Sequence, residues 1–223
     1  MQDIEKFIAG FRRFQQKYFT SSEPLFRKLK EGQAPTTLLI GCSDSRVDPA
    51  LLTDCNPGEI FIVRNVANIV PPCEPDNQHH GVSAAIQFAV CHLEVKQIIV
   101  LGHAHCGGIH KLLHQKQKPN DPFDFLGRWI DILHPAKQQV EKALPHHSHD
   151  EKQHACELAG ILLSLENLLT FPWVKERVEQ GSLTLHGWYF DLEHGELKTY
   201  DPSNGQFLPL VAAPTPTTPP TET

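Results

Sequence analysis

The feature that most constrains the fold is the run TTLLI at residues 36–40, which is β-branched or apolar throughout. An unbroken run of this kind, preceded by Pro35, is typical of a strand buried on both faces. A second strand is predicted at residues 59–66, and a further apolar run at residues 97–102 predicts a third. Residues 81–93 are small and apolar at helical spacing, which predicts a crossover helix. The order strand, helix, strand therefore predicts an α/β fold with a mostly parallel central sheet and flanking helices.

The two ends of the chain predict different structures. Residues 2–19 place apolar side chains at helical spacing, which indicates an amphipathic helix that packs on its own domain or on a partner subunit. Residues 183–190 and 196–200 are expected to form an antiparallel C-terminal edge hairpin. We expect a single domain over residues 1–210 and a disordered Pro/Thr tail over 211–223. Apolar spacing indicates further helices at residues 23–32, 109–116, 121–143 and 151–169.

Composition and charge restrict the cellular compartment and the classes of binding partner that we expect. The chain has 223 residues and a formal net charge of −6, which argues against a nucleic-acid or anionic-membrane partner. Charges between Asp3 and Arg13 interrupt any signal-peptide core, and no run reaches the roughly 20 apolar residues of a membrane span. We therefore expect a cytoplasmic protein. Its six cysteines have no short repeat spacing, so they are expected to be free or metal-bound.

Side chains that can bind a metal ion or take part in catalysis follow two of the predicted strands. Cys42, Asp44 and Arg46 come directly after the first strand, and His103 and Cys106 follow the third. Because sites in open α/β sheets lie beyond the carboxyl ends of the strands, Cys42, His103 and Cys106 are expected to meet. Two thiolates and one imidazole suit zinc, and three protein ligands leave the fourth position open, as in a catalytic site. Asp44 and Arg46 can pair bidentately, which would keep the carboxylate ionised.

Each of these assignments has a plainer alternative. Cys42 could be a buried cysteine beside a surface ion pair, and a His-x-x-Cys pair arises easily by chance among six cysteines and fourteen histidines. His105 could also be a ligand, although its side chain is expected to point away from the other two. The Gly-rich loop after the third strand lacks the Gly-Lys-Ser/Thr ending of a phosphate loop. The remaining His-rich stretches are interpreted as solvated loops: His79-His80 and His146-His147-Ser148-His149.

Several motifs occur in a fixed order between about residues 30 and 200. They are Cys42-Ser-Asp44-Ser-Arg46, Pro57-Gly58-Glu59, Phe61-x-x-Arg64-Asn65-Val66-Ala67-Asn68, His103-x-x-Cys106-Gly-Gly and Leu185-His186-Gly187-Trp188. In these motifs the chain resembles the β-class carbonic anhydrases. The resemblance implies zinc held by Cys42, His103 and Cys106, with Asp44 kept off the metal by Arg46. It also implies reversible hydration of carbon dioxide to bicarbonate and a proton by zinc-bound hydroxide, with Asp44 as the proton acceptor.

Within that family the chain resembles the type with a substrate-binding glutamine and an open zinc site, because Gln33 stands at the matching place. In the other type a tryptophan three residues before the first zinc-binding cysteine forms part of a bicarbonate pocket, and here that residue is Leu39. Phe61, Val66 and Phe88 match the apolar wall of the carbon dioxide pocket. The amide of Gly107 matches a substrate-binding N–H.

The resemblance further implies self-association as a homodimer or a dimer of dimers, with the opening helix wrapped on the partner. Two other functions remain open on the same fold. One is hydrolysis of a sulfur analogue such as carbonyl sulfide or carbon disulfide. The other is a non-catalytic zinc- or bicarbonate-binding module, although such a module would have no need of Gln33, Asp44 and Arg46 together.

Overall fold

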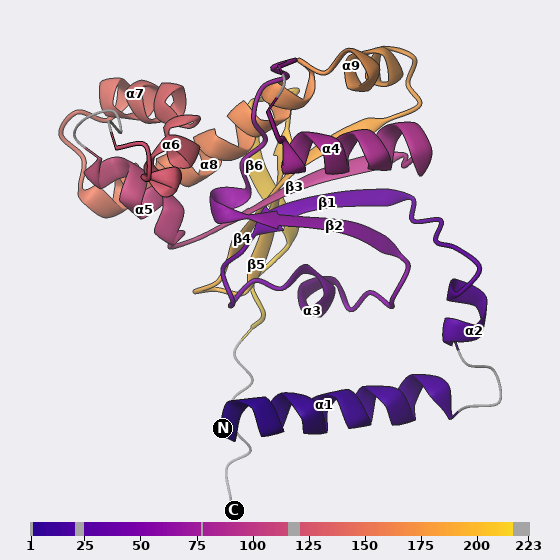
Figure 1. Cartoon of the computed structure of the whole chain (residues 1–223). Coiled ribbons are helices and arrows are strands. Elements are labelled where there is room, and N and C mark those ends of the chain that lie inside the picture. Colours follow the sequence, from indigo (N-terminus) through magenta and orange to yellow (C-terminus); the bar gives the residue numbers. More distant parts are fainter. Residues whose placement is uncertain (1, 21–24, 77, 116–120, 216–223) are drawn as a thin grey trace, which may run out of the picture.

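The computed structural model describes residues 2–20, 25–76, 78–115 and 121–215 (Figure 1). Its centre is a six-stranded sheet with the strand order β2-β1-β3-β4-β5-β6. The strands β2, β1, β3 and β4 are parallel, and β5 and β6 continue the sheet in antiparallel pairing. The strand bounds are β1 Thr37–Cys42, β2 Ile60–Asn65, β3 Gln97–His103, β4 Thr184–Asp191, β5 Glu196–Asp201 and β6 Gln206–Val211. The predicted fold class is therefore confirmed.

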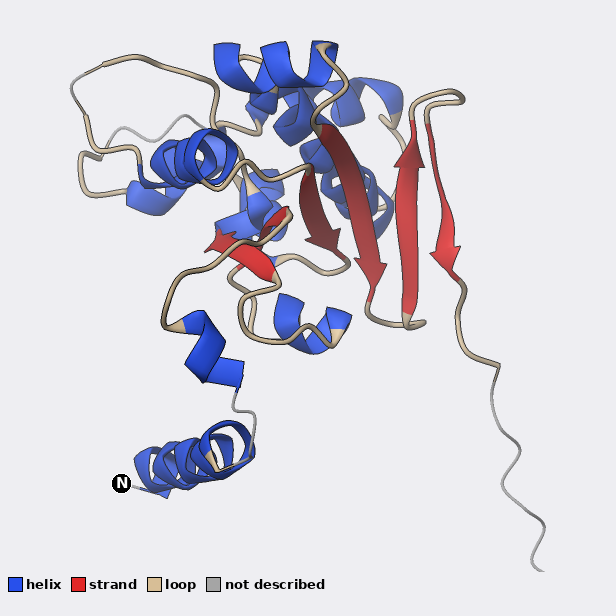
Figure 2. Cartoon of the chain, turned by 90° about the vertical axis from the view of Figure 1, so that its right-hand side faces the viewer, coloured by secondary structure: helices blue, strands red, loops and turns tan. Residues whose placement is uncertain are grey.

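Helices cover the sheet and gather at one end of it. On one face lie α4 and α9, with α3 on the opposite face, while α5, α6 and α7 cluster beyond the carboxyl ends of the parallel strands (Figures 1 and 2). The helix bounds are α1 Gln2–Phe19, α2 Leu25–Leu29, α3 Pro49–Thr53, α4 Gly81–Gln87, α5 Gly107–His114, α6 Phe125–Asp131, α7 His134–Ala143, α8 His149–Leu168 and α9 Pro172–Glu179. A 3₁₀ turn, Val66–Asn68, follows β2, and a π-helical turn, Phe88–His92, extends α4.

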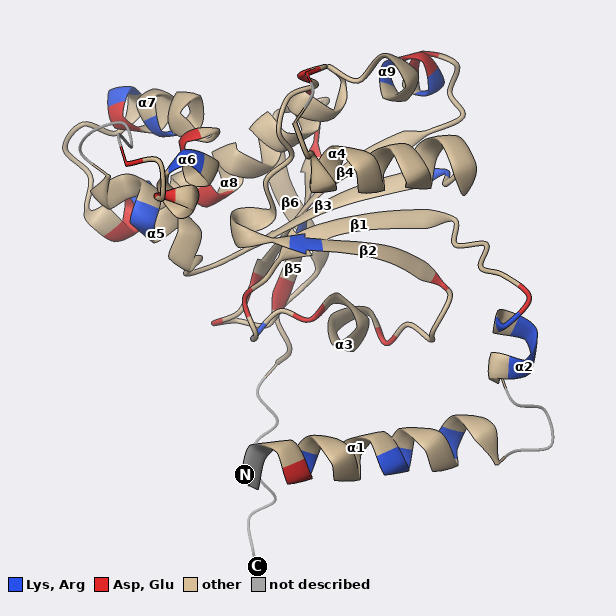
Figure 3. Cartoon of the chain, in the orientation of Figure 1, with Lys and Arg blue, Asp and Glu red and all other residues tan. Residues whose placement is uncertain are grey.

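The central strand β1 is buried on both faces, as its apolar run predicts. Leu38 and Ile40 belong to the larger part of the core, which also includes side chains of α4 and α8. Leu39 points to the other face, where it packs with Ile99 and Leu101. Both signs of charge occupy the helices and loops, whereas β1 carries no charged residue (Figure 3).

The structure corrects several of the predicted elements. The single helix expected over residues 121–143 is two helices, α6 and α7, because Pro135 lacks an N–H and its ring would clash with the carbonyl of Asp131. Helix α3 begins at Pro49, and the carboxylate of its N-cap residue Asp48 accepts hydrogen bonds from the amides of Ala50 and Leu51. Neither α9 nor β6 was expected, and β6 replaces β5 as the edge of the sheet.

The ends of the chain extend from this body. Val211 is still part of β6, and the section of the expected tail from residue 216 onward lies outside the described residues. The predicted opening helix is present as α1, and it packs on α2 through Phe14 and Phe26, whose ring centroids are 5.5 Å apart. Figures 1 and 2 show α1 standing off from the sheet. In the part of the chain that is described, no single helix has both the length and the apolar character to cross a membrane, although the bent pair α8 and α9 passes that test together.

Candidate metal centre and active site

Three potential metal ligands meet at the carboxyl edge of the parallel strands. Gly41 lies opposite Leu101 in the β1–β3 register, so Cys42 and His103 reach the same edge of the sheet. Cys106 precedes α5 as its N-cap residue. The sulfur atoms of Cys42 and Cys106 are 4.0 Å apart, and one ligand atom from each of the three residues lies within 4.8 Å of the others. The set is buried, with His103 only 1% exposed.

The buried imidazole of His103 shows that this donor set fits a metal ion. Its Nδ1 lies 2.8 Å from the carbonyl oxygen of Ala104, which only accepts, so Nδ1 carries the proton and Nε2 has the free lone pair. This Nε2 is buried and has no hydrogen-bond partner among the described residues, an arrangement that costs free energy unless a ligand occupies it. Two sulfurs in tetrahedral zinc coordination lie about 3.8 Å apart, close to the spacing of the two thiols here.

The two thiols differ in acidity. Cys42 shares a hydrogen bond with Cys106, and the amide of Asp44 donates another to it at 3.4 Å, so the pKa of Cys42 lies well below its usual value. The same bond to Cys42, together with burial, raises the pKa of Cys106. Cys42 is therefore the first of the pair to become a thiolate, which is the form that binds a metal.

Asp44 and Arg46 form a bidentate ion pair beside the thiols. Arg46 donates from Nε to Oδ1 at 2.9 Å and from Nη2 to Oδ2 at 2.7 Å. A further bond from Nη2 to the His105 carbonyl, at 3.0 Å, ties the guanidinium to the loop that carries Cys106. The hydrogen bonds from Arg46 hold the pKa of the Asp44 carboxyl well below its usual range. Both carboxylate oxygens are thus engaged by Arg46.

Two charged residues that were given no role from the sequence position these groups. Arg64 donates to the carbonyl oxygen of Cys42 at 2.8 Å and to that of Asp44 at 2.7 Å. These bonds fix the backbone of the loop that carries Cys42 and Asp44. Glu157 on α8 is 4% exposed and accepts the Cys106 amide at 3.0 Å. Arg64 could have been found from the sequence, because it belongs to the Phe61-x-x-Arg64-Asn65 motif. No local pattern indicates a role for Glu157, because its hydrogen-bond partners come from distant segments of the chain.

The residues matched to a substrate pocket fall into two groups. Val66 and Gly107 lie near the metal ligands: Gly107 follows Cys106, and a Cβ on Gly108 would come within 2.8 Å of Val66 Cγ1. Phe61 and Phe88 contact each other, with ring centroids 5.8 Å apart, at the amino end of β2, where Phe61 lies opposite Leu38.

Gln33 lies in the loop before β1 and is exposed. β1 itself spans about 17 Å from Thr37 to Cys42 at ~3.3 Å per residue, and Gln33 lies before its amino end, at the opposite end of the strand from Cys42. One chain therefore does not bring Gln33, Phe61 or Phe88 to its own metal ligands.

The other histidines singled out from the sequence lie apart from this cluster. His105 is exposed, and its Nε2 contacts Glu193 Oε1 at 2.5 Å, so its ring points away from the cluster, as expected. His80 pairs with Asp76 at 2.6 Å.

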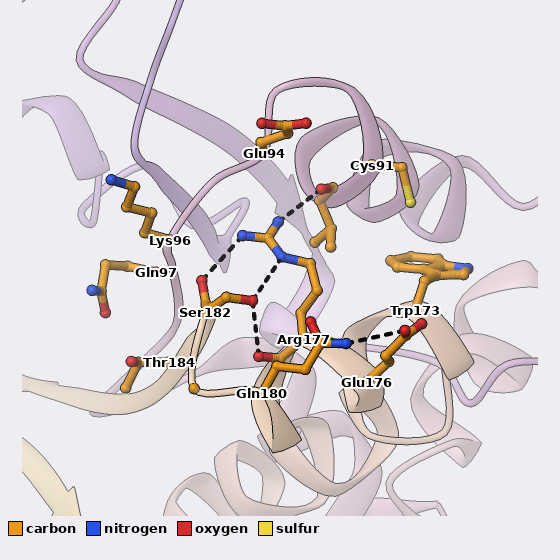
Figure 4. Close-up of a pocket in the computed structure, with 12 residues that line it drawn as sticks. Cys91, Glu94, Lys96, Gln97, Trp173, Glu176, Arg177, Gln180, Ser182 and Thr184 are labelled. Carbon is orange, nitrogen blue, oxygen red and sulfur yellow. Dashed lines mark hydrogen bonds between the residues drawn. The ribbon is translucent and has the colours of Figure 1, made fainter.

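A cavity of about 670 Å³ lies at the amino ends of β3 and β4, at the end of the sheet opposite Cys42 and His103 (Figure 4). Arg177 and Lys96 are the cationic residues among those that line it, and Arg177 lies at its centre (Figure 4). Its guanidinium donates to the Val90 carbonyl at 2.8 Å, to the Ser182 carbonyl at 3.1 Å and to the Ser182 hydroxyl at 3.4 Å. These bonds tie α9 to neighbouring segments, so Arg177 acts as a structural residue.

A parallel sheet with two thiols and one imidazole at its carboxyl edge defines a zinc-binding α/β protein. The family model described as carbonic anhydrase matches residues 37–197. A carbonic anhydrase of Synechocystis sp. is 40% identical over 201 residues, which are 89% of this chain and 71% of that protein. One from Pseudomonas aeruginosa is 38% identical over 214 residues, covering 96% and 94%.

Solved structures agree with the sequence relatives. The β-carbonic anhydrase CcaA matches with a TM-score of 0.86 and 34% identity, over 97% of this chain and 94% of that one. One of two tetrameric β-carbonic anhydrases of Sordaria macrospora matches with a TM-score of 0.70 and 29% identity, over 89% and 93%. The chain belongs to the β-class of the carbonic anhydrase family. Its activity is the zinc-dependent, reversible hydration of carbon dioxide to bicarbonate and a proton.

Proposed function

We propose that Cys42, His103 and Cys106 hold the catalytic zinc and that Asp44 and Arg46 direct the proton transfer of carbon dioxide hydration. The observation that carries this assignment is the convergence of the three ligand atoms within 4.8 Å of one another, beside a bidentate Asp44–Arg46 pair. When bound, zinc acts as a Lewis acid that lowers the pKa of water at its open position toward about 7.

The chain's own residues orient the reaction around that position. The Asp44 carboxylate stays ionised because Arg46 donates to both of its oxygens, so it can accept a proton from the nucleophilic water. Because Arg46 engages both of its oxygens, the carboxylate would not compete for the zinc, and a coordination position would be left for water. The Gly107 amide, at the first turn of α5, can donate to an anionic product, and Val66 offers an apolar contact to carbon dioxide.

The test of this assignment compares Asp44→Asn with Cys106→Ser. Asp44→Asn is expected to keep its zinc and lose on the order of 100-fold or more in hydration rate, since the amide cannot accept the proton. Cys106→Ser is expected to lose the zinc. Zinc content by mass spectrometry and stopped-flow carbon dioxide hydration, with carbonyl sulfide assayed in parallel, provide the measurements.

Asp76→Asn and Cys156→Ser serve as matched controls. Asp76 pairs with a surface histidine, and burial raises the pKa of the Cys156 thiol to about 11, so neither residue is suited to the proposed roles. Near-full hydration activity in Asp44→Asn, or one zinc per chain in Cys106→Ser, would show the assignment to be wrong.

We also propose that the protein functions as a homo-oligomer, either a dimer or a dimer of dimers. Gln33, Phe61 and Phe88 lie at the amino ends of the strands, so a substrate-binding role for them requires the metal centre of a second copy. The exposed apolar residues of α1 and the apolar groove of about 550 Å³ beside Val66 and Trp129 support such an association.

A cytoplasmic location is proposed on the state of the cysteines. None of the six, which all lie among the described residues, forms a disulfide bond, although Cys42, Cys106 and Cys156 are buried. Free thiols of this number are typical of a reducing compartment.

A further inference from the structure

Three exposed histidines meet at the far end of α5, away from the thiol cluster. His110 and His114 lie one turn apart on that helix, and His149 is the first residue of α8. One ring nitrogen from each lies within 4.8 Å of the other two. The ring centroids of His114 lie 4.2 Å from His110 and 4.5 Å from His149. Histidines four residues apart on a helix, joined by a third from another segment, are a common arrangement of zinc ligands.

Hydrogen bonds set the proton positions of two of these rings. His114 Nδ1 lies 2.8 Å from the carbonyl oxygen of His110, which can only accept, so the proton is on Nδ1. His110 Nδ1 lies 3.2 Å from Gln153 Oε1, and the amide nitrogen of Gln153 donates to Glu157 at 3.1 Å. Because Gln153 Oε1 is therefore an acceptor, His110 also carries its proton on Nδ1.

The consequence is that both rings have a free lone pair on Nε2. Metal-binding histidines usually donate their other N–H to a carbonyl or amide oxygen in this way, which orients the ring and raises its basicity. Each of these two rings thus offers an Nε2 lone pair to a metal ion, at a surface position open to solvent. No functional step assigned to the thiol cluster uses them.

We propose that His110, His114 and His149 form a second metal site for a divalent transition ion of the zinc class. Imidazole nitrogens favour zinc, copper and nickel over magnesium or calcium. Three ligands leave at least one position for water or an external ligand. His114 lies about 12 Å along α5 from Cys106, at 1.5 Å per residue, so the site is separate from the catalytic one. His149 is thereby a ligand contributed by α8 rather than a solvated loop residue.

The test is calorimetric titration of Zn²⁺ into the full chain that already holds one zinc. The wild type is expected to bind one further equivalent. His114→Ala and His149→Ala are each expected to lose that equivalent or to bind it at least 10-fold more weakly. Both variants should retain the first zinc, because neither residue contacts the thiol cluster, and this retention also reports correct folding.

His146→Ala combined with His147→Ala is the matched control, since these histidines are equally exposed and near in sequence but lie outside the cluster. It should bind the second equivalent as tightly as the wild type. The proposal is overturned if the wild type binds no second equivalent. It is also overturned if His114→Ala and His149→Ala bind it unchanged, or if the control loses it equally.

Discussion

At the scale of single residues, Gly102 shows how closely α8 packs against β3 beside the proposed metal centre. Gly102 precedes His103 on β3, and a Cβ at this position would lie 2.7 Å from Ile161 Cδ1 and 2.8 Å from Cγ1. Ile161 is fully buried on α8, so it has little room to move. The close approach of α8 to β3 therefore depends on the missing side chain.

Gly102→Ala is expected to destabilise the protein by about 1–3 kcal/mol, the usual cost of overpacking a core. The free energy of unfolding from urea denaturation measures the effect. Gly81→Ala is the control, since nothing lies within 4 Å of its Cβ position, and it should be neutral or slightly stabilising. Ile161→Val removes the nearest methyl, so the double variant should lose less stability than the two single changes added together. Additive losses would contradict the steric explanation.

At the scale of elements, α5 links the proposed zinc-binding residue Cys106 to the rest of the helical layer. Its N-terminus begins at Cys106, and its C-terminal carbonyls are bound by a lysine from α7. Lys137 Nζ donates to the carbonyl oxygens of Leu112 at 3.0 Å, Leu113 at 3.3 Å and Gln115 at 2.8 Å, and the residue is only 7% exposed. A buried cation at this end also complements the helix dipole.

Lys137→Met is expected to lower the free energy of unfolding by about 2–4 kcal/mol, because it leaves buried carbonyls without their charged donor. Guanidinium denaturation followed by circular dichroism gives the value. Lys175→Met provides the comparison: its pair with Glu179 is exposed and 3.9 Å long, so the change should stay within about 0.5 kcal/mol. Equal effects of the two substitutions would rule out the capping role.

At the scale of the whole molecule, α1 presents an apolar surface that the described body does not cover. Ile4, Phe7 and Phe11 are 63%, 66% and 62% exposed, whereas Phe14 packs against α2. Exposed apolar faces of this kind mark surfaces of association. They are consistent with the separation between the metal ligands and the Gln33, Phe61 and Phe88 group in a single chain.

Phe7→Asp combined with Phe11→Asp is expected to shift the protein to a smaller species in light scattering coupled to size-exclusion chromatography. The change adds two negative charges to the apolar face of α1. Arg13→Gln with Gln16→Asp makes the same net charge change on the opposite face and should leave the assembly intact. If Gln33, Phe61 and Phe88 act in a second copy, the smaller species should also retain zinc but lose hydration activity. An unchanged assembly would exclude α1 from the interface.

The sequence predicted those parts of the protein that depend on local patterns. The unbroken apolar runs predicted the buried strands β1 and β3, and the residues after them identified the side chains that meet at the carboxyl edge. Pairing of Asp44 with Arg46 was also predictable, because the two residues are close in the chain and chemically complementary. Pro135 carried a signal for the break between α6 and α7 that the apolar spacing masked.

Only the tertiary structure decided which distant residues share a site. Glu157 meets Cys106, and His149 meets His110 and His114, because α8 packs against β3 and α5, and no local pattern encodes that packing. The same holds for Gln33 and Phe61, whose motifs match a substrate pocket but whose positions lie a full strand length from Cys42. Strand and helix signals are local, whereas the distances between elements follow from how their buried faces fit together.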